Sequence, residues 1–240
     1  MKKLLALLLC VPAIAVASEE AKLDRAPIDT RDAVSIQHGA KIFVNYCLNC
    51  HSAAHMRYNR LKDLGLTEAQ IKDNLMFASD KVGDTMRVAA PAADQKVWFG
   101  KAPPDLSVIA RARGADWLYT YLRGYYRDPA TATGWNNVAF PSVGMPHVLW
   151  QLQGQQAMQV EEREGPHGKE HIKKLVLETP GALKPAEYDR FTADLVNYLV
   201  YMGEPVQTTR KQIGYVVLMV LGVLFVLAYM LKKEYWKDVH

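Results

Sequence analysis

The pentapeptide Cys-Leu-Asn-Cys-His at residues 47–51 limits the choice of fold more than any other part of this chain. Two cysteines three positions apart can bond covalently to the two vinyl groups of a haem, and the next histidine can bind the iron. A bare cysteine pair would fit a zinc site or a thiol–disulfide exchange site equally well. The adjoining histidine, and the lack of any other cysteine pair, favour haem. We therefore expect Cys47, Cys50 and His51 to hold one covalent haem c, with His51 on the iron.

The N-terminal segment resembles a secretory signal peptide. Two lysines precede a short apolar run over residues 4–16, which ends in a small-residue cleavage pattern. This run is too short to span a bilayer. We expect residues 1–17 to be removed, and Cys10 with them. The mature protein would then have no cysteine to spare for a disulfide, although its compartment is oxidising.

A second apolar segment, near the C-terminus, is long enough to cross a membrane. Residues 213–231 contain no charged side chain, and as a helix they would be roughly 28 Å long, close to the ~30 Å hydrocarbon core of a bilayer. We predict a transmembrane anchor over residues 210–231, a cytoplasmic tail over residues 232–240, and a haem domain over residues 18–209 on the periplasmic side. The net charge of +4 partly reflects the basic flanks of this segment and does not indicate a nucleic-acid partner.

Between the two apolar ends, the pattern is mainly α-helical with long loops. Residues 32–45 and 187–202 have apolar side chains at spacings of three and four, which predicts two helices able to pack against each other. Residues 113–127 are rich in aromatic side chains and are expected to begin as a core helix. Residues 158–163 and 171–177 flank a glycine-rich turn and predict a short exposed hairpin. No other strand pair is expected.

Met145 is the candidate for the second axial ligand. An iron that only passes electrons needs both axial positions filled, and a thioether is a common choice. Met145 lies in the loop at residues 140–146, where two prolines limit backbone freedom and Gly144 can allow close approach to a ring. The residues alone leave other ligands open, including histidines that would give a bis-histidine haem. These alternatives are Met76, Met86, Met158, Met202, His38, His55, His147, His167 and His171.

In its order of motifs the chain resembles cytochrome c1, the haem subunit of the ubiquinol–cytochrome c reductase complex, in a bacterial form. The haem motif is followed by Tyr-Asn-Arg-Leu at residues 58–61. A Pro-Pro-Asp-Leu-Ser segment at residues 103–107 then leads into Arg-Ala-Arg at residues 111–113, and this combination is the most diagnostic. Gly-Met-Pro at residues 144–146 and a single C-terminal membrane helix complete the series.

This resemblance implies roles for particular residues. It implies a mainly α fold: a cytochrome c-like haem domain with long loops and one C-terminal transmembrane helix. Met145 becomes the sixth ligand of the iron. Arg113 becomes the partner of a haem propionate, a charge-assisted contact, and Pro104 packs against the haem edge. Trp117 falls near a family position for an aromatic side chain at a propionate, with a shortened spacing from Arg113.

The resemblance also implies a function and partners. The chain would pass single electrons from the Rieske iron–sulfur protein to a soluble or membrane-bound cytochrome c, beside cytochrome b in a dimeric complex. Quinone chemistry would belong to the partner subunits. Mitochondrial members of the family carry a strongly acidic region that helps recruit a basic cytochrome c. In this chain, residues 161–174 mix glutamates with lysine and arginine, so we do not expect an acidic docking face there.

Other functions also fit the haem motif. A cytochrome c subunit of a terminal oxidase or of a nitric oxide reductase is one alternative, although such subunits more often keep an N-terminal anchor. An open-site haem sensor or catalyst is another, in which the sixth position of the iron would be free. A zinc site or a disulfide-exchange module would use the cysteines without haem.

Overall fold

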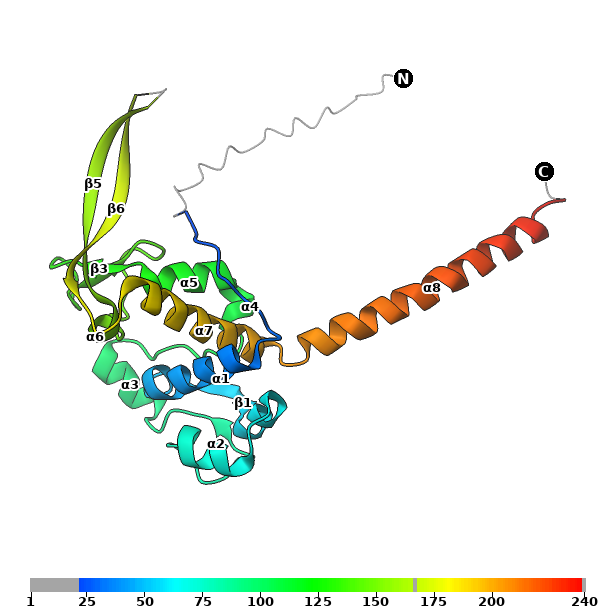
Figure 1. Cartoon of the computed structure of the whole chain (residues 1–240), viewed down its shortest axis with the longest axis horizontal. Helices are drawn as coiled ribbons and strands as arrows, with labels where there is room; N and C mark the ends of the chain where they lie inside the picture. Colours follow the sequence, from blue (N-terminus) through cyan, green and yellow to red (C-terminus); the bar gives the residue numbers. More distant parts are fainter. Residues whose placement is uncertain (1–21, 166–167, 239–240) are drawn as a thin grey trace, which may run out of the picture.

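The computed structural model describes residues 22–165 and 168–238, so the predicted signal peptide lies outside the described residues. The fold is mainly α, as predicted, and one long helix extends from the domain (Figure 1). The helices are α1 (Ala33–Ile42), the π-helical turn η1 (Phe43–Cys47), the 3-10 helix η2 (Tyr58–Leu64), α2 (Glu68–Leu75), α3 (Ala92–Phe99), α4 (Ile109–Arg113), α5 (Ala115–Arg123), α6 (Trp150–Gln153), α7 (Pro185–Gly203) and α8 (Gln207–Tyr235). The strands are β1 (Ala53–Arg57), β2 (Thr85–Met86), β3 (Tyr125–Arg127), β4 (Trp135–Asn137), β5 (Gly154–Gly165) and β6 (Gly168–Pro180).

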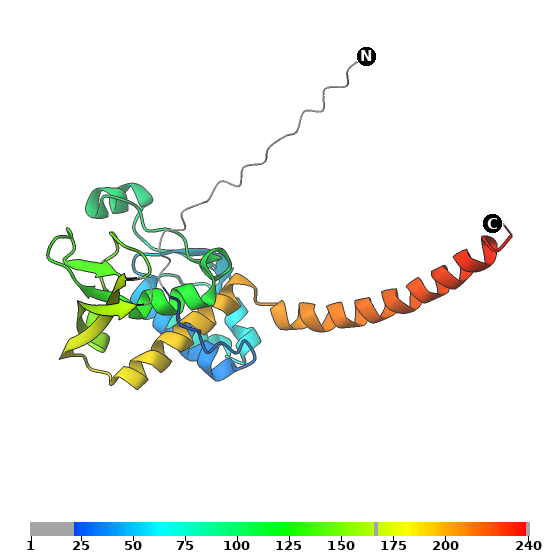
Figure 2. The same cartoon turned by 90° about the horizontal axis from the view of Figure 1, so that it is seen from above.

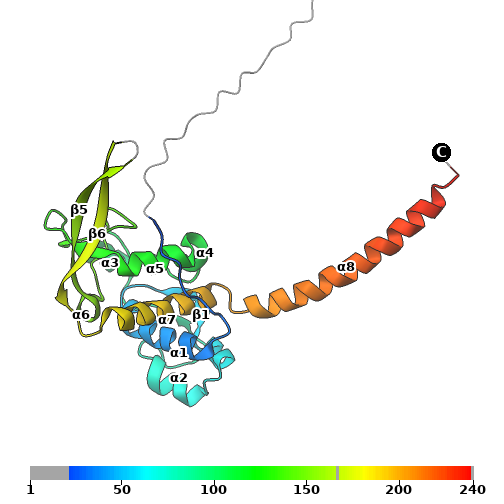
Figure 3. The ribbon, with the colours of Figure 1, turned by 45° about the horizontal axis from the view of Figure 1, so that its top comes forward.

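Helices α1 and α7 pack against each other, as their apolar stripes predict (Figure 3). Their backbones meet at Gly39. A Cβ atom added there would lie 2.0 Å from the carbonyl oxygen of Asp194 and 2.6 Å from the Cβ of Tyr198. Only glycine fits this contact, because real Cβ atoms do not approach other atoms so closely. The crossing of α1 and α7 therefore fixes the position of the chain that leads into the haem motif.

Helix α1 continues without a break into that motif. Asp32 caps its first turn by accepting hydrogen bonds from two backbone N–H groups. At the other end the chain passes directly into η1, whose last residue is Cys47. Phe43 and Val44 in this turn are buried in the core. The motif thus begins at the end of a packed helical segment.

The described residues form three two-stranded antiparallel sheets, of which the sequence predicts one. In the hairpin of β5 and β6, Met158 pairs with Leu175 and Arg163 with Glu170, which confirms the predicted pairing and extends it in both directions. The hairpin projects from the body of the domain (Figure 1). The sheets β1–β2 and β3–β4 contradict the expectation of no further strand pair. Their strands have two to five residues, which is too short to show alternation, and β1–β2 also contains a register shift.

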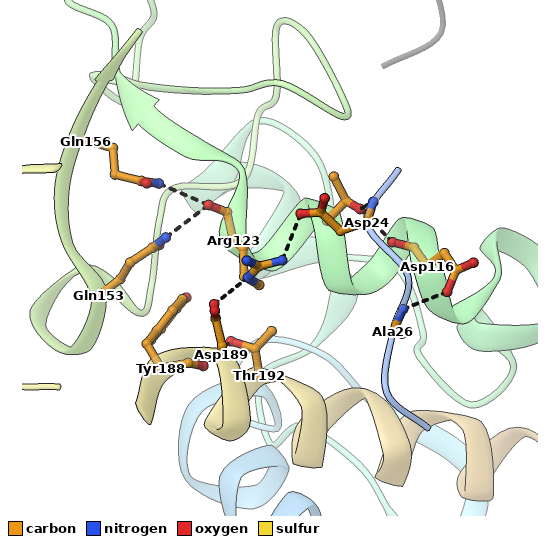
Figure 4. Close-up of polar contacts among 10 residues, drawn as sticks. Asp24, Ala26, Asp116, Arg123, Gln153, Gln156, Tyr188, Asp189 and Thr192 are labelled. Carbon is orange, nitrogen blue, oxygen red and sulfur yellow. Dashed lines mark hydrogen bonds and ion pairs between the residues drawn. The ribbon is translucent and has the colours of Figure 1, made fainter. Parts of the chain in front are cut away.

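Arg123, at the end of α5, joins four parts of the chain (Figure 4). Its Nε donates to the Asp189 carboxylate of α7 at 2.6 Å, and its Nη1 donates to Asp24 of the N-terminal segment at 2.8 Å. Its carbonyl oxygen accepts from the side-chain amides of Gln153 and Gln156, each at 2.9 Å. The base of the hairpin and the N-terminal segment are therefore fastened to the same point on α5.

Helix α8 is long and apolar enough to cross a membrane. It has 29 residues, its most apolar window has a mean hydropathy of 2.5, and none of its residues is buried against the domain. Figure 2 shows it running away from the rest of the chain. Just before it, the Glu204 carboxylate accepts from Arg210 of α8 and lies 3.7 Å from the Arg111 guanidinium of α4. This arrangement fits a single-pass membrane anchor joined to the domain by ion pairs.

Candidate haem site

The two cysteines of the haem motif lie in one tight turn, which begins at Cys47, the last residue of η1. The backbone N–H groups of Cys50 and His51 both donate to the Cys47 carbonyl oxygen, at 3.1 and 2.8 Å. Leu48, between the cysteines, is buried in the core. Both thiols are free and half-buried. Burial, with a further contribution from Cys50, raises the pKa of Cys47 to about 12, so this thiol keeps its proton at neutral pH.

The imidazole of His51 is buried and oriented by one hydrogen bond. Its Nδ1 lies 2.7 Å from the carbonyl oxygen of Pro104. A carbonyl oxygen can only accept, so Nδ1 carries the proton and Nε2 keeps a free lone pair. Burial lowers the pKa of His51, and this favours the neutral ring that a metal ligand requires. The family resemblance implies that Pro104 packs against the haem edge. The structure adds a contact that the sequence does not predict, in which the Pro104 carbonyl orients the histidine.

The diagnostic segment around Pro104 also holds the backbone that follows the haem motif. Partial burial of the Asp105 carboxylate is outweighed by hydrogen bonds from Ser107 and Ala54, which lower its pKa. The segment around Pro104 and the backbone after the haem motif lie side by side. Three hydrogen bonds join them: Leu106 N–H to the Ser52 carbonyl at 2.8 Å, Ala54 N–H to the Asp105 carboxylate at 2.8 Å, and His55 N–H to the Ser107 hydroxyl at 3.0 Å.

Gln95 is a residue of this site that the sequence does not reveal. It is 3% exposed on α3, and its side-chain amide donates to the Cys50 carbonyl oxygen at 3.1 Å. It is the one buried residue of that helix. The sequence does not predict helix α3. It also does not show that a single glutamine will contact a residue forty-five positions away. The amide fastens α3 to the second cysteine of the motif.

Met145 lies half-buried beside a second, smaller apolar cluster. The Tyr121 hydroxyl donates to its sulfur at 3.5 Å. In the loop that carries Met145, the residue with a positive φ is Ser142, at +60°, and not Gly144. Three of the alternative methionines lie buried in the main core instead: Met76, Met86 and Met202.

Arg113 and Trp117 lie next to this region. The exposed guanidinium of Arg113 stands 5.0 Å from the centre of the Trp117 ring and 5.8 Å from that of Phe140. Trp117 in turn stacks on Tyr121, with 4.8 Å between ring centres. A charged guanidinium held by aromatic rings can therefore accept an anionic partner such as a propionate.

The alternative histidine ligands occupy varied positions. The Nδ1 atom of His38 lies 2.7 Å from the Asp194 carboxylate. His147 is 2% exposed and stacks face to face on Tyr125, and burial lowers its pKa to about 4. His171 belongs to β6 of the hairpin, and His167 lies outside the described residues.

Comparison with known proteins decides the family. The model of the cytochrome C1 family matches residues 24–165 and 181–239. The chain belongs to the cytochrome c1 family. It is 50% identical to cytochrome c1 of Allochromatium vinosum, over 98% of this chain and 96% of that protein. Membership confirms the family predicted from the motifs and implies haem c and electron transport in a respiratory chain.

Two further relatives show the range of the match. The chain is 51% identical to a protein of Nitrosomonas europaea named ammonia monooxygenase gamma subunit, over all of this chain and 98% of that protein. It is 26% identical to the mitochondrial cytochrome c1 of Saccharomyces cerevisiae, over 89% of this chain and 70% of that protein. The family match omits residues 166–180, which include the whole of β6. The second strand of the hairpin therefore lies outside the family match.

The donor atoms at the site fit a covalent haem. Two free thiols lie in one turn, and the imidazole beside them has its Nδ1 committed to Pro104. Within residues 22–165 and 168–238, no group of three or more His, Cys, Asp or Glu side chains could hold a metal ion. Cys47 and Cys50 therefore lack the further ligands of a tetrahedral zinc site.

Proposed function

We propose that this chain is a membrane-anchored c-type cytochrome with one haem, bound covalently through Cys47 and Cys50. It passes single electrons from a Rieske iron–sulfur protein to a cytochrome c. The observation that supports this most strongly is the pairing of His51 with the Pro104 carbonyl beside two free thiols, in a member of the cytochrome c1 family.

Each site residue has a defined task in this proposal. The haem, when bound, supplies one-electron exchange between ferrous and ferric iron. His51 would offer its neutral Nε2 to the iron, and Met145 would offer its thioether. Arg113 pairs with a propionate, and Pro104 keeps the imidazole in one tautomer and one orientation. With His51 and Met145 both holding the iron, the site would leave no position for a substrate.

The membrane topology and partners follow from the same proposal. Residues 1–17 are removed, residues 18–209 face the periplasm, the anchor at residues 210–231 crosses the bacterial inner membrane, and residues 232–240 lie in the cytoplasm. Cytochrome b and the Rieske protein are the partners, in a dimeric complex. The name of one relative supports such a complex: the cytochrome b-c1 complex catalytic subunit of Candida albicans is 26% identical over 88% of this chain.

A second candidate function comes from the relative in Nitrosomonas europaea. Its name describes a subunit of a monooxygenase, and its identity of 51% equals that of the Allochromatium cytochrome c1 within one percentage point. Under this alternative the chain would associate with oxygenase subunits instead of cytochrome b. The two candidates differ in their partners, so they can be separated by the composition of the purified complex.

Purification of the tagged full chain in mild detergent tests the proposal. We expect a di-haem cytochrome b and a Rieske protein to accompany the chain, and quinol to reduce its haem. A variant with Cys47→Ser and Cys50→Ser is the control, because it lacks both points of covalent attachment. Recovery of the chain with oxygenase subunits and without cytochrome b would contradict the proposal. A pyridine haemochrome assay on the same sample tests the covalent haem separately.

A further inference from the structure

A relay of two tyrosine hydroxyls ends at the sulfur of Met145. The Tyr121 hydroxyl lies 3.5 Å from this sulfur, and the Tyr125 hydroxyl lies 2.7 Å from that of Tyr121. A thioether sulfur carries no proton and can only accept. The proton of Tyr121 therefore points at Met145, and Tyr125 donates its own proton to Tyr121.

Aromatic stacking fixes the two rings in place. The Tyr121 ring stacks on Trp117, with 4.8 Å between ring centres and 14° between planes. The Tyr125 ring is 1% exposed and stacks on His147, with 4.7 Å between centres and 5° between planes. Rotating either phenol would break a stack. The hydroxyls are therefore held in position by contacts that do not involve the sulfur.

We propose that Tyr121 is a positioning residue for Met145 and raises the reduction potential of the haem, and that Tyr125 strengthens its effect. This inference rests on the proposed function, in which Met145 is the second axial ligand. A thioether binds iron through one lone pair and can accept a hydrogen bond through the other. Donation from Tyr121 withdraws electron density from the sulfur, which disfavours ferric iron more than ferrous iron. The hydrogen bond from Tyr125 polarises the Tyr121 hydroxyl and makes it a stronger donor.

The chain contains a second tyrosine–methionine pair, which serves as a matched control. The Tyr198 hydroxyl donates to the Met86 sulfur at 3.3 Å, and both residues are fully buried in the main core. Met86 is not an iron ligand in the proposed function. Removing the Tyr198 hydroxyl thus breaks the same kind of hydrogen bond without touching the axial thioether.

Potentiometric titration of the haem in the purified full-length protein tests the relay. Tyr121→Phe keeps the ring that stacks on Trp117 and removes only the hydroxyl. We expect its reduction potential to fall below that of the wild type, and the exchange of Met145 for added imidazole to become faster. Tyr125→Phe is expected to shift the potential in the same direction by a smaller amount. Tyr198→Phe is expected to shift it far less than Tyr121→Phe.

The results that overturn the proposal are distinct. If Tyr121→Phe leaves both the potential and the imidazole exchange unchanged, Tyr121 does not act on the ligand. If the reduction potential shifts in Tyr198→Phe but not in Tyr121→Phe, the thioether ligand of the iron would be Met86 instead of Met145. A wild-type ferric protein without the far-red absorption band of thioether-to-iron ligation would overturn the Met145 assignment itself, and the relay with it. With that band present, an unchanged Tyr121→Phe overturns the relay alone.

Discussion

The Asp105 carboxylate holds the backbone that follows the haem motif against the segment around Pro104. One of its oxygens accepts from the backbone N–H of Ala54 and the other from that of Ser107, each at 2.8 Å. At pH 7 we expect Asp105→Ala to lower the free energy of unfolding by about 1 kcal/mol, because both donors lose their charged acceptor at a solvent-exposed position. Urea denaturation monitored by haem absorption measures this change. Asp105→Asn is the matched control, since it keeps one acceptor oxygen.

The effect of Asp105 also depends on pH in a defined direction. Its pKa is lowered in the folded protein, so its contribution is complete above the ordinary aspartate pKa of ~4 and is lost as pH falls through the lowered value. The difference in stability between wild type and Asp105→Ala should therefore close in acid. A difference that stays constant from neutral pH to acid would show that the charge of the carboxylate plays no part.

At the scale of whole elements, the crossing of α1 and α7 makes the most direct prediction. Gly39→Ala places a Cβ 2.0 Å from the Asp194 carbonyl oxygen, so the two helices must move apart. We expect a loss of about 2–3 kcal/mol in stability, the upper part of the range for overpacked cores. Thermal unfolding measures it. Gly83→Ala is the control, because a Cβ there meets no atom within 4 Å; equal losses in the two variants would contradict this account of the crossing.

The hairpin of β5 and β6 should be dispensable for haem binding. Its outer part projects from the domain, and the family match omits residues 166–180 (Figure 1). We propose to replace residues 160–173 with Asn-Gly, which suits a two-residue turn between the paired Gln159 and Lys174. Haem content should stay at the wild-type level, and stability should change by less than about 0.5 kcal/mol.

A change at the base of the hairpin should behave differently. The Gln156 amide donates to the carbonyl oxygens of Arg123 and Tyr125, at 2.9 and 2.8 Å. Gln156→Leu leaves both acceptors with one donor fewer, so it should cost more stability than removing the whole outer hairpin. The opposite order would show that the tip packs on the domain.

The elements differ in how far the sequence predicts them, for physical reasons. Helices α1, α7 and α8 show their apolar periodicity or length directly in the sequence. Helix α3 does not, because Gln95 is its one buried residue and three apolar residues at its end are exposed. The short strands of β1–β2 and β3–β4 have no room for an alternating pattern. The β1–β2 pair is also fixed by contacts between segments distant in the chain, which local patterns do not contain.

The residues of the site also divide into those that the sequence predicts and those that it does not. Cys47, Cys50 and His51 are readable because covalent haem attachment needs those residue types at that spacing. Met145 follows from a loop with two prolines, together with the family resemblance. Tyr121 is not readable in this way, since a tyrosine in an aromatic helix is more often a packing residue. Its role depends on a hydroxyl that meets a sulfur twenty-four positions away.

For the molecule as a whole, the haem domain should fold without its anchor. None of the residues of α8 is buried against the domain. Ending the chain after Arg210 keeps the contact of Glu204 with Arg210 and Arg111 and removes the apolar segment. We expect an exported, water-soluble protein whose haem spectrum and reduction potential match those of the full chain. Loss of haem from the truncated protein would show that α8 stabilises the domain.

The central claim is that side chains close both axial positions of the iron, so that the protein passes electrons and binds no substrate. Addition of carbon monoxide to the reduced native protein tests this most directly. Met145→Ala is the positive control and should bind carbon monoxide rapidly, because it lacks the thioether. We expect the wild-type spectrum to stay unchanged on the same timescale. Rapid binding of carbon monoxide by the wild type would contradict the central claim.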